Sequence, residues 1–430
     1  MGAKSQTEGD VAEVTRKLAE RWAERDPFEL ANRATAQLMD SVADWNPPPG
    51  IEPSRPPVRL GVGIPDAVTL PREELRQALE RAMAAPRDQP LRYHFGPGFE
   101  PLREQLARRY TRQRGLPVDL SWFWLANGSS GAIDLICRTL IDPGDVIISE
   151  EPSYMGTLHN FRGVEAQIRS VPMDEEGMRV EELEKVLREV EQRGERVKLI
   201  YTISSFQNPT GASLSEARRR ELLRVAADRD ALILEDDAYA ELYFDAPPPQ
   251  SLFAMSGGHG VVSVGTFSKI LATGLRVGWI HARPEWIDFF RRMRFDMGQS
   301  VLIHRMLAEY IEAGQLEAHV EQMRALYAHK AELLCSCLEE FAGPYLHLTP
   351  PQGGFYLWVG LLDGLTADAV WRAGAAEGVW FPKGSSFFPE RIDRTGEHIR
   401  LAFPWISTEE LREGARRIGI ACERAARAGV

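Results

Sequence analysis

The sequence contains few cysteines, and they follow no pattern typical of a metal site. Four of the 430 residues are cysteine, and no two of them form a CxxC pair. The spacing therefore indicates neither a disulfide framework nor a zinc knuckle. Free thiols in a chain of this length favour the reducing environment of the cytoplasm. The four residues are Cys137, Cys335, Cys337 and Cys422.

Long apolar runs and a leader-like start are missing as well. No stretch approaches the roughly 18 apolar residues that a membrane helix needs. Residues 1–10 are polar and acidic and lack the apolar centre of a secretion signal. We therefore expect a protein that is not embedded in a membrane.

An excess of positive charge is also absent. Lysine and arginine number 51 and aspartate and glutamate number 62, so the formal net charge is 51 − 62 = −11. An acidic surface repels polyanions, so nucleic acid and anionic membranes are not expected as partners, although one local basic pocket could still hold an anion. The hydrophobic share of 44% and charged share of 26% are typical of a soluble globular protein.

The chain is long enough for two domains preceded by an arm. Two amphipathic helical patterns run between Val11 and Trp45, divided at Asp26-Pro27, and the segment 46–50 (Asn-Pro-Pro-Pro-Gly) breaks them. We predict a helical arm over residues 1–55, a large domain over residues 56–300 and a small C-terminal domain over residues 301–430.

Short apolar runs alternate with helical patterns after the arm. Strands are predicted at residues 145–148, 199–203, 232–234 and 261–264, and a helix capped by Ser215 at residues 215–229. Such alternation predicts an α/β fold with a mostly parallel sheet and right-handed crossovers. Beyond residue 300 one long helical pattern, residues 303–341, precedes separated strands at residues 354–359 and 398–401, which indicates a smaller α+β domain.

Ligands of α/β sheets bind at the carboxyl ends of the strands, so the segments that follow the strands matter most. Asn127-Gly128-Ser129-Ser130-Gly131 precedes a helical run, and a helix N-terminus after small residues can hold an anion. An ordinary helix start explains the same residues. Gln207-Asn208-Pro209-Thr210-Gly211 closes another strand and is, on its own, only a turn sequence.

Charged residues follow two further strands. Asp236 stands at the end of one strand, with Tyr239 three residues later, and Lys269 leaves the next strand just after Ser268. Arg276 follows seven residues beyond the lysine. Acidic residues at strand ends are usually solvated, and a lysine can reach solvent along a buried surface, so each residue alone has an ordinary structural explanation.

These motifs together carry a resemblance. The ordered segments are Asn-Gly-Ser-Ser-Gly-Ala from residue 127, Glu-Pro-Ser-Tyr from 151, Gln-Asn-Pro-Thr-Gly from 207, Asp-Asp-Ala-Tyr from 236, Ser-Lys at 268 and Arg-Val-Gly from 276. The chain resembles pyridoxal-phosphate enzymes of fold type I, and within them the class I/II, aspartate-aminotransferase-like aminotransferases. The resemblance runs from about residue 55 to the end. It implies a large cofactor-binding domain, its sheet sandwiched by helices, and a smaller C-terminal domain.

The resemblance implies pyridoxal 5′-phosphate as the cofactor. Lys269 is implied to form the Schiff base and move the proton, because that step needs a primary amine. Asp236 is implied to face the pyridine nitrogen, and Asn208 and Tyr239 to bond the phenolic oxygen. Tyr154 is implied to stack on the ring. The groups implied to bind the phosphate are Gly128, Ser129, Ser130, Thr266, Ser268 and Arg276.

The resemblance also implies how substrate and subunits meet. Arg400 is implied to bind the substrate α-carboxylate through its planar fork, with a second contact from Asn208, and Gly63 lies in the segment that closes over the substrate. Tyr93 matches the tyrosine that reaches the cofactor phosphate of a neighbouring subunit. A homodimer with shared active sites follows as an expectation. The alternative is that Tyr93 packs in its own core.

The implied function is transfer of an amino group between an amino acid and a 2-oxo acid. The same motifs would also serve a pyridoxal-phosphate-dependent lyase, cyclase or oxidase in a biosynthetic pathway, so that alternative stays open. A third alternative, a regulator with a basic winged-helix head, is disfavoured because the roughly 55 residues before the resemblance are acidic.

The residue spacing does not match a dinucleotide-binding loop or a metal site. Gly61-Val62-Gly63 begins like a dinucleotide-binding loop, but Asp66 occupies the third glycine position and Pro65 prevents the helix from starting there. There is no HExxH motif, and His94 has no partner at ligand spacing, so we expect no metal.

Overall fold

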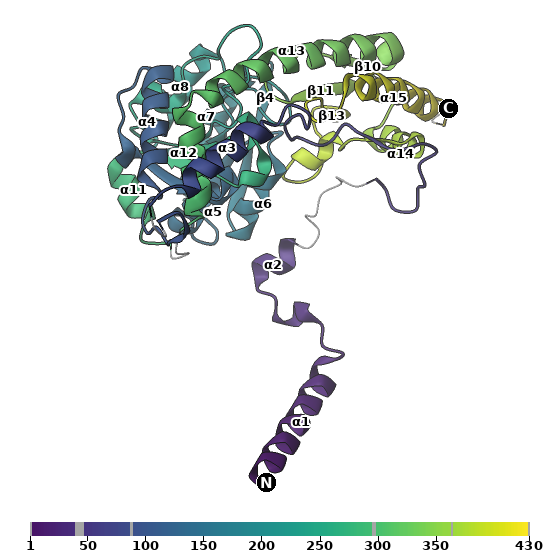
Figure 1. Cartoon of the computed structure of the whole chain (residues 1–430). Helices are drawn as coiled ribbons and strands as arrows, with labels where there is room; N and C mark the ends of the chain where they lie inside the picture. Colours follow the sequence, from purple (N-terminus) through teal and green to yellow (C-terminus); the bar gives the residue numbers. More distant parts are fainter. Residues whose placement is uncertain (1, 39–46, 87–88, 295–297, 363, 429–430) are drawn as a thin grey trace. The chain divides into compact units, whose positions relative to one another are not determined.

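A computed structural model describes residues 2–38, 47–86, 89–294, 298–362 and 364–428 (Figure 1). The chain divides into two compact units, residues 1–42 and residues 43–430. None of the helices in these described ranges combines the length and apolar character that crossing a membrane requires. The same ranges contain no group of three or more His, Cys, Asp or Glu residues that could hold a metal ion.

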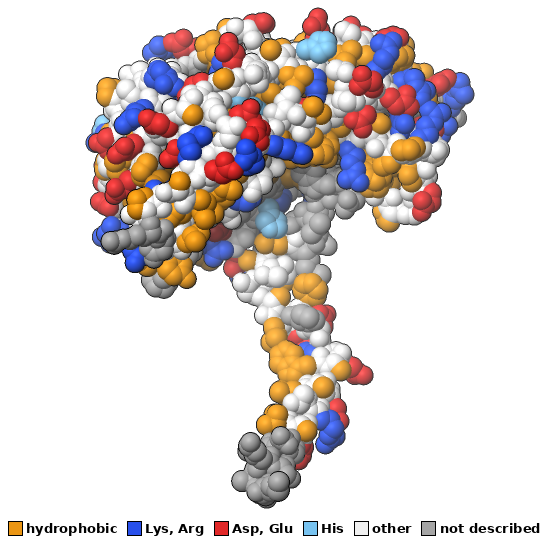
Figure 2. Space-filling view, in the orientation of Figure 1, with side chains coloured by type: hydrophobic (Ala, Val, Ile, Leu, Met, Phe, Trp, Pro, Cys, Tyr) orange, Lys and Arg blue, Asp and Glu red, His pale blue; other side chains and the backbone are white. Residues whose placement is uncertain are grey.

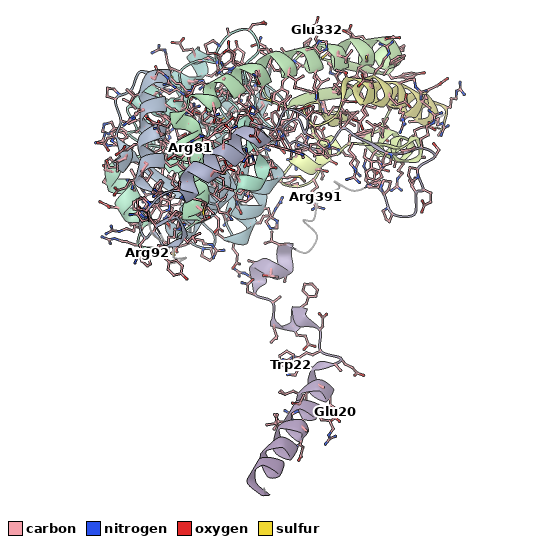
Figure 3. The ribbon with its side chains drawn as sticks, in the orientation of Figure 1. Glu20, Trp22, Arg81, Arg92, Glu332 and Arg391 are labelled. Atoms are coloured by element: carbon pink, nitrogen blue, oxygen red, sulfur yellow. The ribbon has the colours of Figure 1, made fainter. Side chains whose placement is uncertain are left out.

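The first unit is helical. It contains α1 (Gly2–Trp22), the short η1 (Pro27–Leu30) and α2 (Arg33–Leu38). Asp26 lies between α1 and η1 and caps the N-terminus of η1, because its side chain accepts a hydrogen bond from the Phe28 backbone N–H at 2.9 Å. Apolar side chains repeat along α1 at helical spacing and are half exposed, and Trp22 lies near its end (Figures 2 and 3). The predicted end of the second helical pattern, at Trp45, lies outside the described residues.

The second unit is built on an eight-stranded sheet, in the order β2-β9-β8-β7-β6-β3-β4-β5. Strands β8, β7, β6, β3 and β4 are parallel, whereas β9 and β5 are antiparallel to their neighbours. This confirms the predicted α/β fold with a mostly parallel sheet. The strands are β2 (Phe123–Ala126), β3 (Val146–Glu151), β4 (Gln167–Asp174), β5 (Gly177–Met178), β6 (Val197–Thr202), β7 (Leu232–Asp236), β8 (Val261–Thr266) and β9 (Gly278–His281).

Both faces of this sheet are buried, which explains why its strands read as continuous apolar runs. Ile147 and Leu199 belong to one core, whereas their neighbours Ile148 and Ile200 belong to the other, as the two-residue period of a strand requires. Helices α5 (Gly128–Leu140) and α6 (Met155–Gly163) contribute to the first core, and α7 (Val180–Gln192) and α8 (Glu216–Asp228) to the second. The predicted cap of α8 is present, since Ser215 Oγ accepts from the Arg218 backbone N–H.

The predicted long helix over residues 303–341 is wrong as a single element. It is two helices, α12 (Val301–Glu312) and α13 (Gln315–Ala342), because Gly314 between them has a φ of +70° that ends the helical path. α12 packs against α3 (Arg72–Met83) and α4 (Glu100–Arg114). The boundaries predicted at residues 55 and 300 stay predictions.

A second, three-stranded antiparallel sheet follows in the order β10-β11-β13. Its strands are β10 (Leu346–Leu348), β11 (Tyr356–Leu361) and β13 (His398–Ala402). Helices α14 (Ala367–Glu377) and α15 (Thr408–Ala428) pack together beside α13, and β1 (Val58–Arg59) pairs in parallel with β12 (Val379–Trp380). The early segment before residue 60 is therefore joined to the C-terminal part of the chain.

The remaining elements are short. They are η3 (Gln89–Leu91), η4 (Leu120–Trp122), α9 (Leu252–Ser256), α10 (Phe267–Ile270), η5 (Thr273–Leu275), α11 (Pro284–Phe290), η6 (Gly343–Tyr345) and η7 (Gly384–Phe387). α10 and η5 follow β8 directly, at the edge of the sheet where the parallel strands end.

Candidate active site

The turn between β2 and α5 forms a cradle at a helix N-terminus. Gly128 has a φ of +70°, and a Cβ added there would lie 2.7 Å from Nη2 of Arg276. That guanidinium donates to the carbonyl of Asn127 at 3.3 Å, so it lies across the start of α5. Free N–H groups, the helix dipole and a cation therefore converge at one place, as an anion-binding site requires.

Hydroxyl groups at the end of β8 face the same place. Thr266 Oγ1 accepts from the Ser268 backbone N–H at 3.1 Å, and the two side-chain oxygens are 3.0 Å apart. Lys269 follows on α10, and its Nζ donates to the carbonyl of Gly63 at 2.7 Å. The amine also lies 5.8 Å from the ring centroid of Tyr239. The lysine thus reaches into the site instead of extending into solvent.

Asp236, the last residue of β7, is buried with one oxygen already bonded. Its Oδ2 accepts from the hydroxyl of Tyr201 at 3.1 Å, and that hydroxyl lies 3.1 Å from the hydroxyl of Thr157. No described residue bonds its Oδ1, which is also buried. Burial raises the pKa of Asp236 to about 6, opposed by the hydrogen bond from Tyr201. A buried acceptor with an open position indicates a ligand that donates or is charged there.

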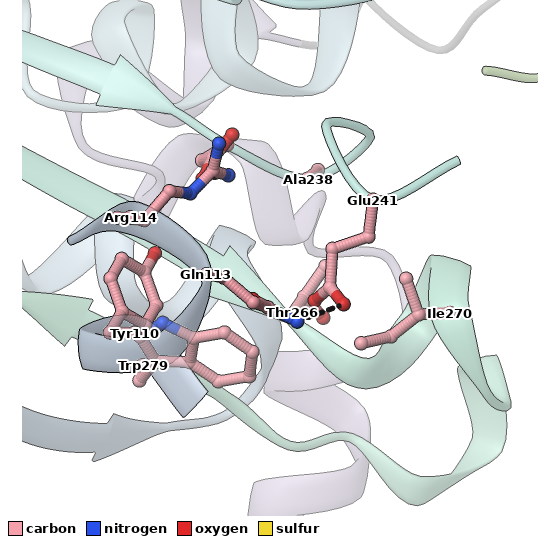
Figure 4. A pocket seen from close by; sticks show the side chains of 9 residues that line it. Tyr110, Gln113, Arg114, Ala238, Glu241, Thr266, Ile270 and Trp279 are labelled. Carbon is pink, nitrogen blue, oxygen red and sulfur yellow. Dashed lines mark hydrogen bonds and ion pairs between the residues drawn. The ribbon is translucent and has the colours of Figure 1, made fainter. Parts of the chain in front are cut away.

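The next residue, Asp237, turns away from this site. Its Oδ2 forms an ion pair with Nη2 of Arg114 at 2.6 Å. Figure 4 shows the small cavity at that side, which Tyr110, Arg114 and Trp279 line and where Gln113 donates to Glu241 at 3.0 Å. The two adjacent carboxylates therefore have different surroundings: Asp236 lines the cavity that Lys269 also lines, whereas Asp237 is ion-paired to Arg114 and has a buried Oδ1 that no described residue bonds.

Arg400 on β13 is completely buried and held on several sides. Its Nη1 donates to Oδ1 of Asn208 at 3.0 Å and its Nη2 to the carbonyl of Gly61 at 2.7 Å. Its guanidinium carbon lies 4.4 Å from the ring centroid of Tyr356 and 4.7 Å from that of Phe387. Cation–π contacts and two charge-assisted hydrogen bonds fix the direction of its fork.

The structure brings most of the predicted residues around one cavity of about 110 Å³. Its lining includes Ser129, Ser130, Tyr154, Asn208, Asp236, Tyr239, Thr266, Ser268, Lys269 and Arg276. The other three predicted residues of the same subunit touch this lining: Gly128 contacts Arg276, Gly63 accepts from Lys269, and Arg400 donates to Asn208.

Tyr93 is the exception. It does not line the cavity of its own chain, its side chain is 73% exposed, and its described ring neighbour is Phe95 at 6.1 Å. The alternative in which Tyr93 packs inside its own core is therefore wrong.

Comparisons with known proteins agree with this geometry. The sequence profile of the family "Aminotransferase class I and II" matches residues 55–418. The chain belongs to this family. It is 34% identical to aromatic-amino-acid aminotransferase 1 of Thermococcus litoralis, over 84% of this chain and 87% of the relative. It is 33% identical to the 2-aminoadipate transaminase of Thermus thermophilus, over 90% of this chain and 94% of that enzyme.

The fold of this chain is also that of solved aminotransferase structures. The α-aminoadipate aminotransferase LysN from Thermus thermophilus, complexed with N-(5′-phosphopyridoxyl)-L-leucine, superposes with a TM-score of 0.82 at 29% identity. The match covers 93% of this chain and 98% of that one. The fold is therefore fold type I, the cofactor is pyridoxal 5′-phosphate, and the reaction is transfer of an amino group between an amino acid and a 2-oxo acid.

The residues of the aminotransferase fit this cofactor. The open Oδ1 of Asp236 suits a protonated ring nitrogen, and the cradle at Gly128 with the hydroxyls of Thr266 and Ser268 suits a phosphate. Lys269 supplies a primary amine at the same cavity. The donor set thus offers a partner for each polar part of pyridoxal phosphate.

Three buried polar residues near the site were not predicted from the sequence. Tyr201 bonds Asp236, and Tyr356 lies between Tyr239 and Arg400. Glu150, at the end of β3, accepts from Thr202, from the Ile203 backbone N–H and from Gln207, and burial raises its pKa to about 7. The tyrosine hydroxyl in the buried second half of strand β6 was the available signal for Tyr201.

Proposed function

We propose that Lys269 is the residue that holds pyridoxal phosphate covalently in this cavity. The observation that carries the proposal is the position of its Nζ in the same cavity as the buried Oδ1 of Asp236, which no described residue bonds. A lysine amine and an unpaired buried carboxylate oxygen suit the two ends of one pyridine ring. Treatment with borohydride should fix the cofactor to Lys269, and a label on any other lysine would contradict the proposal.

The cofactor's phosphate would be held at the N-terminus of α5. Gly128, Ser129 and Ser130 offer backbone and hydroxyl donors there, and Arg276 adds a cation. Thr266 and Ser268 would complete the set from the neighbouring strand end. These six residues would then surround one dianion with donors.

The ring would be held by four side chains. Asp236 would pair with the protonated nitrogen, and Asn208 and Tyr239 would bond the phenolic oxygen. Tyr154, which lines the same cavity, would cover one face of the ring. When bound, pyridoxal phosphate supplies an aldehyde for the substrate's amino group and a ring that spreads the negative charge left at the substrate α-carbon.

Lys269 would then move the proton. Its amine is freed when the substrate's amino group takes its place, and Nζ can carry the proton from the substrate α-carbon to the carbon that bears the cofactor's aldehyde. Arg400 would bind the α-carboxylate, helped by Asn208, and so would fix which bond at the α-carbon faces the lysine. Gly63, whose carbonyl accepts from Lys269, would close this end of the site.

The amino donor is proposed from the relatives. The names of the two enzymes compared above give aromatic amino acids and 2-aminoadipate as their substrates. We propose aromatic donors with a 2-oxo acid as acceptor. A screen of amino acids by the change in cofactor absorbance tests this, with the 2-oxo acid and pyridoxamine phosphate measured as products. Elimination, cyclisation or oxidation products in their place would favour the lyase, cyclase or oxidase alternative.

We also propose a homodimer in which each subunit supplies Tyr93 to the other's cofactor phosphate. The support is its 73% exposure beside two further exposed apolar residues, Leu91 and Phe95. A phenol there offers one donor on a rigid apolar body that also suits an interface.

We further propose a cytoplasmic location and a biosynthetic role. The four cysteines support the location, because all are buried and free, as expected in a reducing compartment.

Hybrid dimers test the shared site. In a dimer of Tyr93→Phe with Lys269→Ala, one site would carry both defects and the other neither, so about half of wild-type activity should remain. If Tyr93 serves its own subunit, each site carries one defect and no full-activity site survives. A monomer with full activity would equally contradict the shared site.

A further inference from the structure

We propose that Tyr356 is a positioning residue of this active site, which fixes the Tyr239 hydroxyl with its own hydroxyl and the Arg400 guanidinium with its ring. The inference rests on the proposed function of those two residues and goes beyond it, because Tyr356 is assigned no contact with cofactor or substrate. Three independent observations support it: strand register, a hydroxyl pair and a glycine that leaves room for that pair.

The strand register places Tyr356 beside Arg400. On the paired strands β11 and β13, Tyr356 is opposite Ala402 and Trp358 is opposite Arg400. Residues 356, 358, 400 and 402 therefore point to one face of the sheet, and Tyr356 and Arg400 are diagonal neighbours on it. The ring centroid of Tyr356 lies 4.4 Å from the guanidinium carbon, and Phe387 covers it at 4.7 Å.

The hydroxyl of Tyr356 reaches the other side of the site. It lies 3.2 Å from the hydroxyl of Tyr239, and both side chains are buried. A Cβ added at Gly63 would lie 2.1 Å from the same hydroxyl, closer than two non-bonded atoms can approach. Gly63 is thus the residue type that leaves the Tyr356 hydroxyl its place, while its carbonyl accepts from Lys269.

The direction of donation follows from the number of protons. A phenol carries one O–H, so a Tyr239 that donates to the cofactor's phenolic oxygen can only accept from Tyr356. Tyr356 would then donate to Tyr239, and the two hydroxyls would form a chain that ends on the phenolic oxygen. Successive donors polarise one another, so the outer hydroxyl strengthens the inner hydrogen bond.

Other charged and titratable groups face this pair and must be considered in any pH effect. They come from different elements and are unchanged by replacing Tyr356: Tyr154 before α6, Asp236 on β7, Lys269 on α10 and Arg400 on β13. Removing one hydroxyl therefore changes one hydrogen bond while these charges keep their positions.

The test is the pH titration of the visible absorbance of the protein loaded with pyridoxal phosphate. A donor directed at the phenolic oxygen favours the high-pH form, in which that oxygen carries more negative charge. Tyr356→Phe should therefore raise the titration midpoint by about half a pH unit, the size of one modest hydrogen bond. Because the ring remains, the KM for the best amino acid of the screen should stay within about twofold.

Tyr356→Leu separates the two roles. It removes ring and hydroxyl together, so it should show the same shift of the midpoint and, in addition, a KM raised about tenfold through the lost contact with Arg400. Tyr310→Phe is the matched control, because it removes a buried tyrosine hydroxyl on α12, away from the cavity, and should shift neither quantity.

The outcomes are distinguishable. An unchanged midpoint in Tyr356→Phe, with wild-type protein titrating normally, would overturn this inference and leave the proposed function intact. A midpoint shifted equally by Tyr310→Phe would overturn it as well, since the effect would then be one of general stability. Wild-type protein without cofactor absorbance would overturn the proposed function itself.

Discussion

The two sides of the active site are built differently. On the cofactor side, Asp236 ends β7, Lys269 follows β8 on α10 and Arg276 precedes β9, and an oxygen of Asp236 is left without a described partner. On the substrate side, Arg400 is enclosed by Asn208, the Gly61 carbonyl and two aromatic rings. The first side is open to a ligand, whereas the second is held in position before any ligand arrives. Mutations on the first should therefore affect chemistry and cofactor binding, and those on the second substrate binding.

The largest effect is expected at Lys269. Lys269→Ala removes both the covalent attachment and the group that moves the proton, so turnover should fall by at least about 10⁴-fold. The side chain is only half buried and reaches into a cavity, so the free energy of unfolding should change by less than about 1 kcal/mol. Single-turnover kinetics measure the loss of turnover, and chemical denaturation measures the change in the free energy of unfolding. Near-normal turnover would refute the assignment.

Substitution of the adjacent residues Asp236 and Asp237 should affect different properties, catalysis in one case and stability in the other. Asp236→Ala should slow the chemical step about a thousandfold, which corresponds to ~4 kcal/mol for a lost charge at the reacting centre. Asp237→Ala should leave that step nearly unchanged but lower the free energy of unfolding by about 3 kcal/mol, because it leaves the largely buried guanidinium of Arg114 without its ion-pair partner. Equal kinetic losses at both positions would mean that any substitution at the end of β7 disturbs the local structure, and would contradict a specific role for Asp236.

Arg400→Lys tests the substrate side. A lysine keeps the charge but cannot offer the planar fork, so the KM for the amino donor should rise about 30- to 100-fold. The dissociation constant for pyridoxal phosphate should stay within about threefold, since Arg400 lies outside the lining of the cofactor cavity. A comparable loss of cofactor affinity would remove the distinction between the two sides.

The smallest expected effect is the pH dependence of the affinity for pyridoxal phosphate. Burial raises the pKa of Asp236 to about 6 in the protein without cofactor, so the carboxylate is ionised above that pH and neutral below it. Affinity for pyridoxal phosphate should therefore weaken as the pH falls from 7 to 5, by about tenfold for a lost ion pair. Asp236→Asn should bind more weakly and lose this part of the pH dependence. Parallel curves for both proteins would assign the dependence to another group.

The sequence predicted most of the residues that line the cavity but missed buried polar residues behind them, such as Tyr201 and Tyr356. Asp236 is the last residue of the buried strand β7 and Lys269 lies three residues beyond the end of β8, and apolar runs buried on both faces are easy to recognise. Tyr356 was missed because its partner Tyr239 is 117 residues away, and only the packing of the two sheets brings the hydroxyls together. The break at Gly314 was missed because the apolar periodicity continues across it and its positive φ is visible only in the structure.

Borohydride reduction of the holoprotein, followed by peptide mapping, tests the central claim most directly. The account predicts one phosphopyridoxyl group per chain, on the peptide that contains Lys269, and no label after Lys269→Ala. A label on another lysine, or a fully labelled Lys269→Ala protein, would contradict it.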